Sequence, residues 1–262
     1  MMDRRVFVQA MGGSTMLGAM PQSEAPAGSG KRTRLYRLTF YYLRMGDQGG
    51  LLNRFLSSQI PLFRKTIPGP LGVFNVFVGP RIPAVVTLAG FPGYAEMEAA
   101  GRQIPADPGY RKALAEAEQG AEPPFDSSET ILLEATDYSP EITLLAEKPK
   151  TPRIFELRVY HSPTHRQLRL LHERFAGPEI KIFHRVGVHP ILYTSTVFGP
   201  HQPNLTYLTP FSTLAEREKA WEAFGADPEW VKVRKESVDR GGQITNYISI
   251  MLLRPADYSP IQ

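Results

Sequence analysis

The tetrapeptide Asp137-Tyr138-Ser139-Pro140 returns 120 residues later as Asp257-Tyr258-Ser259-Pro260. Further pairs of segments keep the same spacing. They are Val78-Gly79-Pro80 with Phe198-Gly199-Pro200, Ala106-Asp107-Pro108-Gly109-Tyr110 with Ala226-Asp227-Pro228-Glu229-Trp230, and Ile60-Pro61-Leu62-Phe63-Arg64 with Ile180-Lys181-Ile182-Phe183-His184. Self-similarity at a fixed period indicates a repeated structural unit. The chain is therefore predicted to contain two copies of one module.

Near the start of the predicted modules the spacing is 119 residues, because Leu35–Tyr41 (LYRLTFY) matches Ile154–Tyr160 (IFELRVY). A difference of one residue in the first loop accounts for this change. The modules are predicted to span 34–143 and 153–262. A Lys- and Pro-rich linker, 144–152, joins them.

Hydrophobic periodicity predicts the elements of the second module. Strict alternation over Ile154–Tyr160 indicates a half-buried strand, and Asp227-Pro228 has the residues preferred at the start of a helix. The predicted strands are 154–160, 190–198, 205–209 and 244–253, and the predicted helices are 164–174, with a continuation over 179–185, 213–224 and one that begins at Asp227. The order strand, helix, strand, strand, helix, strand is that of the ferredoxin-like unit. The first module follows the same order.

Composition excludes several classes of protein. The chain has 262 residues, of which 42% are hydrophobic and 21% are charged, which is enough apolar material for one large domain or two small ones. It has no cysteine, which excludes disulfides, cysteine nucleophiles and thiolate metal sites. The net charge of +4 is mild and no Lys/Arg run exceeds two residues, so no nucleic-acid partner is expected.

The beginning of the chain has the features of an export signal. Arg4-Arg5 is followed by the uncharged stretch 6–23 and then by small residues over 25–27. The arginine pair is typical of a twin-arginine signal. Residues 1–27 are thus predicted to be a removable signal and 28–33 a disordered leader, which places the mature protein in the periplasm. The weakly apolar stretch is too short to span a bilayer, so no stable membrane span is expected.

Two blocks of the second module carry a family resemblance. Arg153–Tyr160 (RIFELRVY) and Phe224–Trp230 (FGADPEW), followed by the closing strand, resemble the NIPSNAP family, and the first module resembles it more faintly. The resemblance implies the dimeric α/β-barrel superfamily, in which two ferredoxin-like units form one barrel. The expected fold class is therefore α+β, with two tandem βαββαβ modules that close such a barrel within one chain.

The two faces of the first strand of the second module differ in polarity. Phe155, Leu157 and Val159 are expected to pack on the helices. Glu156, Arg158 and Tyr160 would then point into the barrel, where charged groups must be paired or contact a ligand. We predict that these three residues bind a ligand. The alternative is that the charges pair with the other copy and only close the barrel. Arg37 holds the place matched to Glu156, so Arg37 or Arg158 is predicted to face Glu156 in the lumen.

Other polar residues complete the candidate ligand site. His184 could act as an acid or base near neutral pH, and the alternative is a surface position. Tyr193, Tyr207 and Tyr247 lie on predicted strands and could line a pocket with their hydroxyl groups.

The histidines of the second module do not form a metal site in the sequence. His161 precedes a proline at a strand end, and His165 and His172 lie two helical turns apart, with no carboxylate that completes a ligand set. No metal and no cofactor are predicted.

The resemblance implies no single chemistry, because the family has none established. Related barrels include cofactor-free monooxygenases and haem-degrading enzymes, and the fold alone does not choose among them. The favoured hypothesis is an exported module that binds a small molecule or another protein, with a possible homo-oligomer. The alternative hypothesis is a cofactor-free monooxygenase or isomerase that acts in the barrel lumen.

Overall fold

The structure is a computed structural model that describes residues 31–262, of which Arg32–Gln262 form one compact unit. The predicted export signal and residues 28–30 of the predicted leader lie outside the described residues. Within the described part of the chain, no helix is both long enough and apolar enough to cross a bilayer.

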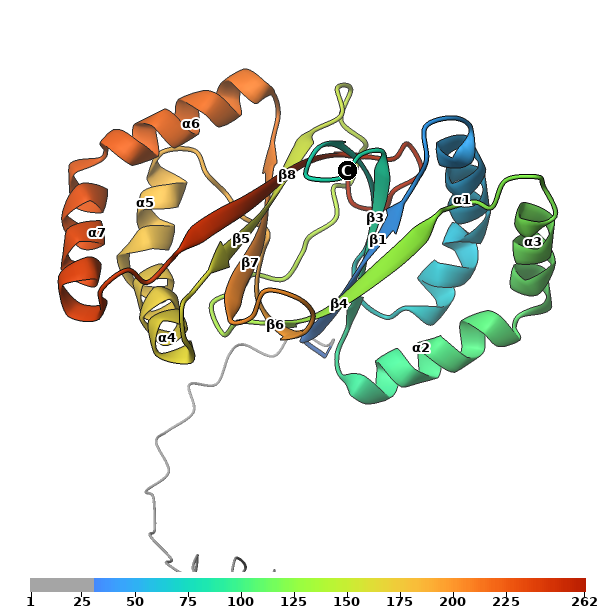
Figure 1. The fold of residues 1–262 in the computed structure, drawn as a ribbon, viewed down its shortest axis with the longest axis horizontal. Helices are drawn as coiled ribbons and strands as arrows, with labels where there is room; N and C mark the ends of the chain where they lie inside the picture. Colours follow the sequence, from blue (N-terminus) through green and yellow to red (C-terminus); the bar gives the residue numbers. More distant parts are fainter. Residues whose placement is uncertain (1–30) are drawn as a thin grey trace, which may run out of the picture. The chain divides into compact units, whose positions relative to one another are not determined.

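Eight strands form a central barrel, and helices flank it on two sides (Figure 1). The strands are β1 (Leu35–Tyr42), β2 (Leu71–Val78), β3 (Ala84–Phe91), β4 (Ser127–Ala135), β5 (Ile154–His161), β6 (Leu192–Phe198), β7 (Asn204–Phe211) and β8 (Tyr247–Pro255). The helices are α1 (Gln48–Thr66), α2 (Tyr94–Ala106), α3 (Pro108–Glu118), α4 (His165–Arg174), the π-helical turn η1 (Phe175–Glu179), α5 (Ile180–Arg185), α6 (Leu214–Ala226) and α7 (Pro228–Gly241). Helices α1 to α3 cover the first half, and α4 to α7 cover the second.

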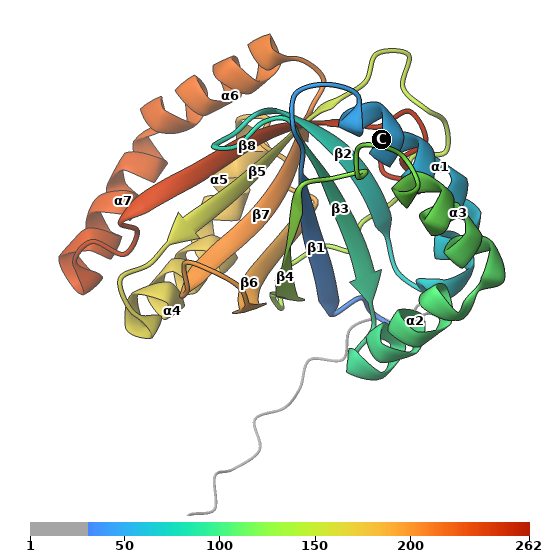
Figure 2. The same ribbon diagram turned by 45° about the vertical axis from the view of Figure 1, so that its right-hand side comes forward.

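The barrel closes in the order β1-β3-β2-β8-β5-β7-β6-β4, and all neighbouring strands are antiparallel. Figure 2 shows this order across the sheet. Each half contributes four strands in the ferredoxin-like order, and the halves join edge to edge through β2 with β8 and β4 with β6. Because each edge strand pairs with an edge strand of the other half, its backbone N–H and C=O groups are not free to pair with another chain. The predicted fold class, an α+β barrel closed within one chain, is confirmed.

The lumen of the barrel is apolar. Leu38, Phe74, Leu157 and Leu208 belong to one buried cluster together with Phe155, whose ring lies 5.1 Å from that of Phe74. The prediction that Phe155 and Leu157 pack on helices is therefore wrong.

The opposite face of β5 lies against the helices, so Glu156 and Arg158 do not point into the lumen. Arg37 of β1 also lies away from the lumen, with its guanidinium 5.7 Å from the ring of Phe91. Arg158 does pair with Glu156, but on the helix side of β5, so the predicted position of the pair in the lumen is wrong. The physical reason is that a narrow eight-stranded lumen is filled by side chains, which favours apolar residues, whereas the helices can supply partners to charged ones.

The repeated Asp-Tyr-Ser-Pro segments explain how the halves hold each other. Ser139 follows β4, and its Oγ accepts the backbone N–H of Tyr193 on β6 at 3.0 Å. Ser259 follows β8, and its Oγ accepts the backbone N–H of Val73 on β2 at 2.9 Å. Each half therefore sends its final segment across to the other half, at places 120 residues apart. We call these two segments, 137–140 and 257–260, the clasps.

The tyrosines of the clasps make the corresponding second contact. The Tyr138 hydroxyl lies 2.7 Å from Nδ1 of His172, and the Tyr258 hydroxyl donates to Oδ1 of Asn53 at 2.7 Å. His172 and Asn53 are 119 residues apart, whereas the matched segments at Ile180 and beyond are 120 apart. The extra residue thus lies in the π-helical turn η1, and its predicted place in the first loop is wrong.

We expect Ser139→Ala and Ser259→Ala each to lower the free energy of unfolding by about 1–3 kcal/mol, because each substitution leaves a buried backbone N–H without an acceptor. Urea unfolding measures the change. Ser128→Ala on β4 is the control, since Ser128 is exposed. Unfolding midpoints for the clasp variants that match the control would contradict this role of the clasps.

Candidate functional site

The polar face of β5 meets helix α6. Glu156 is fully buried, and its carboxylate accepts hydrogen bonds from Nε of Arg217 (2.9 Å), Nε1 of Trp221 (2.8 Å) and Nε of Arg158 (2.5 Å). Nη2 of Arg217 donates as well, at 3.1 Å, and these hydrogen bonds from three residues offset the cost of burying the carboxylate. The strand therefore holds a charged network against the helix.

Arg158 is the cation of this network that lies deepest in the structure. Its side chain is 11% exposed, and its guanidinium lies 3.6 Å from the ring centroid of Trp221, which is cation–π geometry. Burial alone would lower the pKa of Arg158, but the neighbouring Tyr207, Tyr160 and Glu156 raise it. The arginine is therefore a fixed positive charge.

A second buried arginine lies nearby, on α4. Arg174 donates from Nε to Glu179 of the π-helical turn at 2.6 Å and from Nη1 to Ser237 at 3.2 Å. Its guanidinium lies 4.9 Å from the ring centroid of Trp230. Burial raises the pKa of Glu179 to about 7, against the opposing effect of Arg174. Arg158 and Arg174 therefore have the same kinds of neighbour. Each donates from Nε to a buried glutamate and lies beside a tryptophan ring.

A cavity of about 540 Å³ lies between β5, β8, α6 and α7, and we call it the arginine cavity. It is lined by Arg158, Arg174 and Arg234 and by the aromatic residues Trp221, Phe224 and Trp230. Arg158 and Arg174 each use only Nε and Nη1 in hydrogen bonds, so within residues 31–262 neither Nη2 has a protein acceptor. The cavity therefore has unused donors beside aromatic walls.

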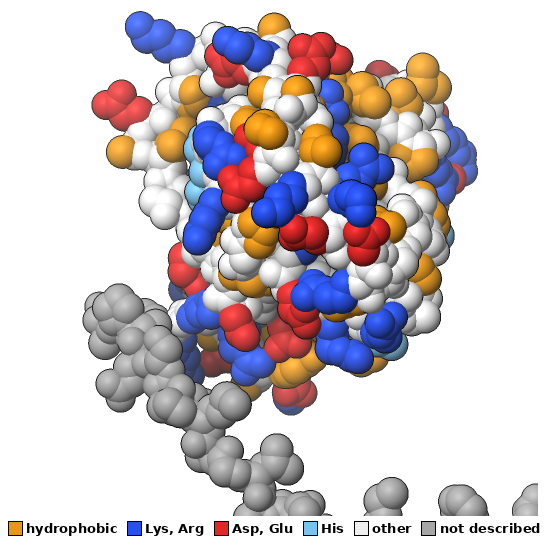
Figure 3. Space-filling model, turned by 90° about the vertical axis from the view of Figure 1, so that its left-hand side faces the viewer, with side chains coloured by type: hydrophobic (Ala, Val, Ile, Leu, Met, Phe, Trp, Pro, Cys, Tyr) orange, Lys and Arg blue, Asp and Glu red, His pale blue; other side chains and the backbone are white. Residues whose placement is uncertain are grey.

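Charge near the arginine cavity is more positive than on the surface around it. Arg158, Arg174 and Arg217 lie with Arg234 around two acids, Glu156 and Glu179. The outer surface over these helices displays Lys and Arg side by side with Asp and Glu (Figure 3). The excess of cations is thus a property of the cavity and would favour an anion there.

The structure brings some of the predicted ligand residues together. Arg158, Tyr160 and Tyr247 line the arginine cavity, but on the helix side of the sheet and not in the lumen. Tyr207 lies behind them, with its hydroxyl donating to that of Tyr160 at 3.1 Å. Glu156 does not line the cavity but holds Arg158 through a hydrogen bond to its Nε. Their role in binding a ligand stays a prediction.

The other predicted residues do not line the arginine cavity. Tyr193 is buried and packs against both Tyr207 and Tyr138 of the clasp, with ring centroids 5.8 Å and 5.5 Å away. His184 lies at the end of α5, where its ring stands 5.2 Å from that of His189. Within residues 31–262 no group of three or more His, Asp or Glu side chains is placed to hold a metal ion.

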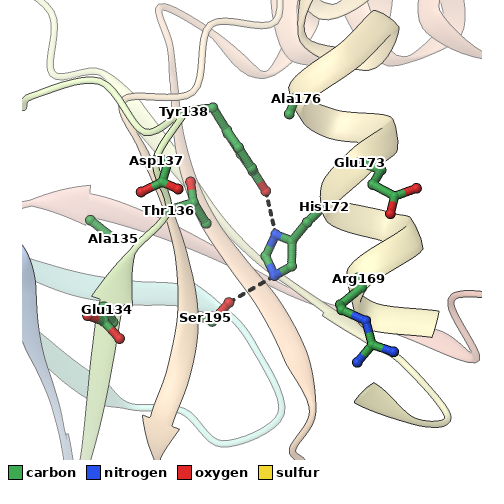
Figure 4. A pocket seen from close by; sticks show the side chains of 10 residues that line it. All are labelled: Glu134, Ala135, Thr136, Asp137, Tyr138, Arg169, His172, Glu173, Ala176 and Ser195. Carbon is green, nitrogen blue, oxygen red and sulfur yellow. Dashed lines mark hydrogen bonds between the residues drawn. The ribbon is translucent and has the colours of Figure 1, made fainter. Parts of the chain in front are cut away.

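A second, more open hollow of about 770 Å³ lies where the first clasp meets α4 and β6 (Figure 4). His172 is at its centre, with Nδ1 2.7 Å from the Tyr138 hydroxyl and Nε2 2.9 Å from Oγ of Ser195. Burial lowers the pKa of His172, so the ring is neutral at neutral pH. Sequence reasoning missed this group because its members come from both halves. In the first half, Asn53 matches His172 and Asn75 matches Ser195. A comparison of the two halves at these positions would have shown that the second half has a titratable residue where the first has an amide.

The fold is that of a dimeric-type α/β barrel, and the comparisons agree with it. A monooxygenase-like protein from Fusobacterium nucleatum has 8% identity and a TM-score of 0.57, with 86% of this chain and 93% of that chain covered. An anthrone oxidase-like protein has 13% identity and a TM-score of 0.52, with 86% and 92% covered. These likenesses show the fold alone.

The second half carries a family match. The model of the NIPSNAP family matches residues 155–260. A NIPSNAP-like domain protein from Burkholderia xenovorans has 26% identity over 41% of this chain and 89% of that chain, with a TM-score of 0.35. No curated protein matches the chain. Residues 155–260 contain every lining residue of the arginine cavity.

The raised pKa of Glu179 predicts a pH dependence. Its carboxyl has an ordinary value of 4.5 and titrates at about 7 when folded, so between these values the native state binds more protons than the unfolded state. Stability therefore falls as the pH rises through this window. Relative to Glu179→Gln, the wild type should lose about 3 kcal/mol between about pH 4 and about pH 8.

Urea unfolding across that pH range measures the difference. Glu173→Gln serves as the control, because the Glu173 side chain is 59% exposed one residue before Arg174. Parallel stability curves for the wild type and Glu179→Gln would show that the carboxyl stays charged when buried.

Proposed function

We propose that the protein is a small-molecule-binding module and that the ligand occupies the arginine cavity. The ligand class is an anion, such as a carboxylate, attached to an aromatic or apolar body. The observation that carries the proposal is the pair of buried arginines, Arg158 and Arg174, each with a free Nη2 in one aromatic-walled cavity.

Each part of the cavity has a counterpart in such a ligand. Guanidinium groups bind carboxylates through charge-assisted hydrogen bonds that are stronger than neutral ones. Hydrogen bonds to Glu156 and Glu179 already hold the arginine side chains in place, so little side-chain entropy is lost on binding. Trp221, Phe224 and Trp230 supply the apolar contact area. The volume of about 540 Å³ is within the ordinary range for ligand pockets.

The first half differs at the matched positions. Arg158 and Glu179 have Thr39 and Gln59 as counterparts, and Tyr207 has Thr87. A buried ionic network costs desolvation energy and is weak evidence for stability. Its presence in the second half alone supports a binding role there, and a scaffold role for the first half.

The proposal extends to the whole chain and its location. We propose that residues 34–143 and 153–262 are two copies of a NIPSNAP-type module joined by 144–152, and that residues 1–27 direct the protein to the periplasm. The lumenal oxygenase or isomerase hypothesis is not favoured, since the residues on which it rested lie outside the lumen.

Intrinsic fluorescence tests the binding proposal directly, because Trp221 and Trp230 are the only tryptophans of the chain and both line the arginine cavity. The probes are 3-phenylpropanoate and the uncharged 3-phenylpropanamide, which have the same shape. We expect the carboxylate to bind about tenfold more tightly or better, because charged hydrogen bonds contribute about 1.5–3 kcal/mol.

Variants locate the effect. Arg158→Gln should lower the affinity for 3-phenylpropanoate at least about tenfold and leave the affinity for the amide nearly unchanged. Arg234→Gln removes a positive charge at an exposed lining position of the same cavity. Arg240→Gln is the control, since Arg240 lies on the same helix outside the cavity and is 57% exposed. Equal titrations of the two probes, or equal losses in the control, would refute the proposal.

A further inference from the structure

A separate cavity opens into the barrel lumen. It has a volume of about 180 Å³ and lies at the end of the barrel where β1 and β5 finish and β4 and β8 begin. Pro80 and Pro200 border it. They belong to the repeated Gly-Pro segments 79–80 and 199–200, so both halves contribute matching loops to one mouth. The two cavities have no lining residue in common, although Tyr247 of the arginine cavity stacks on His161 of this one.

The lining of this lumenal cavity is part apolar and part polar. The apolar part is formed by Leu38, Phe40, Ile131, Leu157, Val159 and Met251. The polar part includes Thr196 and Thr206, whose hydroxyl groups both donate to Oδ1 of Asn204. An engineered cavity of about 150 Å³ with Leu, Ile and Phe walls stays dry and binds benzene. The lumenal cavity is of similar size and has similar side chains over the apolar part of its lining, so it fits one six-membered ring with a small substituent.

The first half places a carboxylate at the rim. Glu129 accepts a hydrogen bond from the Tyr42 hydroxyl through Oε2 at 3.2 Å. The guanidinium of Arg81 lies 4.2 Å from the ring centroid of Tyr42. Within residues 31–262 no donor reaches Oε1 of Glu129. The rim thus has one charged acceptor with an unused oxygen.

The second half places the uncharged pair His161 and Ser249 at the positions matched to Tyr42 and Glu129. Nε2 of His161 lies 3.0 Å from Oγ of Ser249, and the ring stacks 4.1 Å from that of Tyr247. Burial lowers the pKa of His161, so the imidazole brings no positive charge at neutral pH. His201 beside it has a φ of 60°, a strained value for a residue with a side chain.

We propose that the lumenal cavity is a second ligand site, for an uncharged ring of benzene size that carries one hydroxyl. The ring would occupy the apolar wall, and the hydroxyl would donate to Oε1 of Glu129. An anionic ligand is disfavoured by the carboxylate, and a ligand without a donor cannot form the hydrogen bond to Oε1 of Glu129. The site differs in charge and in place from the arginine cavity, so the two proposals stand independently.

Isothermal titration with p-cresol, toluene and p-toluate tests the proposal. We expect p-cresol to bind about tenfold more tightly than toluene, because it makes one hydrogen bond to a charged acceptor. We expect no binding of p-toluate in this cavity. Absence of p-cresol binding to the wild-type chain overturns the proposal.

Two kinds of variant place the ligand. Glu129→Leu should lower the affinity for p-cresol about tenfold and change the affinity for toluene less than about twofold. Glu134→Leu is the control, because Glu134 lies on the same strand but outside this cavity. Val159→Phe fills the wall and should abolish binding of both molecules, with circular dichroism to verify the fold. Unchanged p-cresol binding in either variant overturns the proposal.

The arginine cavity supplies the cross-check. Arg158→Gln should leave p-cresol binding unchanged, and Val159→Phe should leave 3-phenylpropanoate binding unchanged. Loss of p-cresol binding in Arg158→Gln would mean that p-cresol binds in the arginine cavity, and the lumenal site would be refuted while the proposed function stands.

Discussion

Closure of the barrel is the constraint on which the rest of the structure depends. A ferredoxin-like sheet has one face under helices and one bare face, and here the bare faces of both halves enclose a common lumen. The edge pairs β2 with β8 and β4 with β6 make this possible within one chain. The clasps strengthen the same two junctions, because Ser139 binds β6 and Ser259 binds β2.

Closure also decides where charge can lie. The narrow lumen accepts apolar side chains, so Glu156 and Arg158 lie on the outer face of β5, where Arg217 and Trp221 of α6 reach them. The same separation gives the chain an apolar interior and a cationic cavity on opposite sides of one sheet. Only a single layer of strands separates the two proposed ligand sites, yet each has its own chemistry.

The repeat in the sequence predicted two ferredoxin-like modules, and the resemblance to the NIPSNAP family implied that they close one barrel. The start of α7 at Asp227 followed from local capping rules. The faces of β5 were assigned wrongly, since alternation shows that two faces differ but not which one turns inward. The group around His172 was missed because Tyr138 and Ser195 reach it from different halves. The π-helical turn that places Glu179 was missed because one added residue leaves hydrophobic periodicity nearly intact.

The crossing of the clasps also sets the order of events in folding. Strand β2 lies early in the chain, but its neighbour on one side is β8, and the residue that caps its backbone is Ser259, almost at the end. The first half can pair its own four strands, but its β2 edge has no partner until β8 has been made. Contacts of such long sequence separation are slow to form, and until they form an apolar face stays open to other chains.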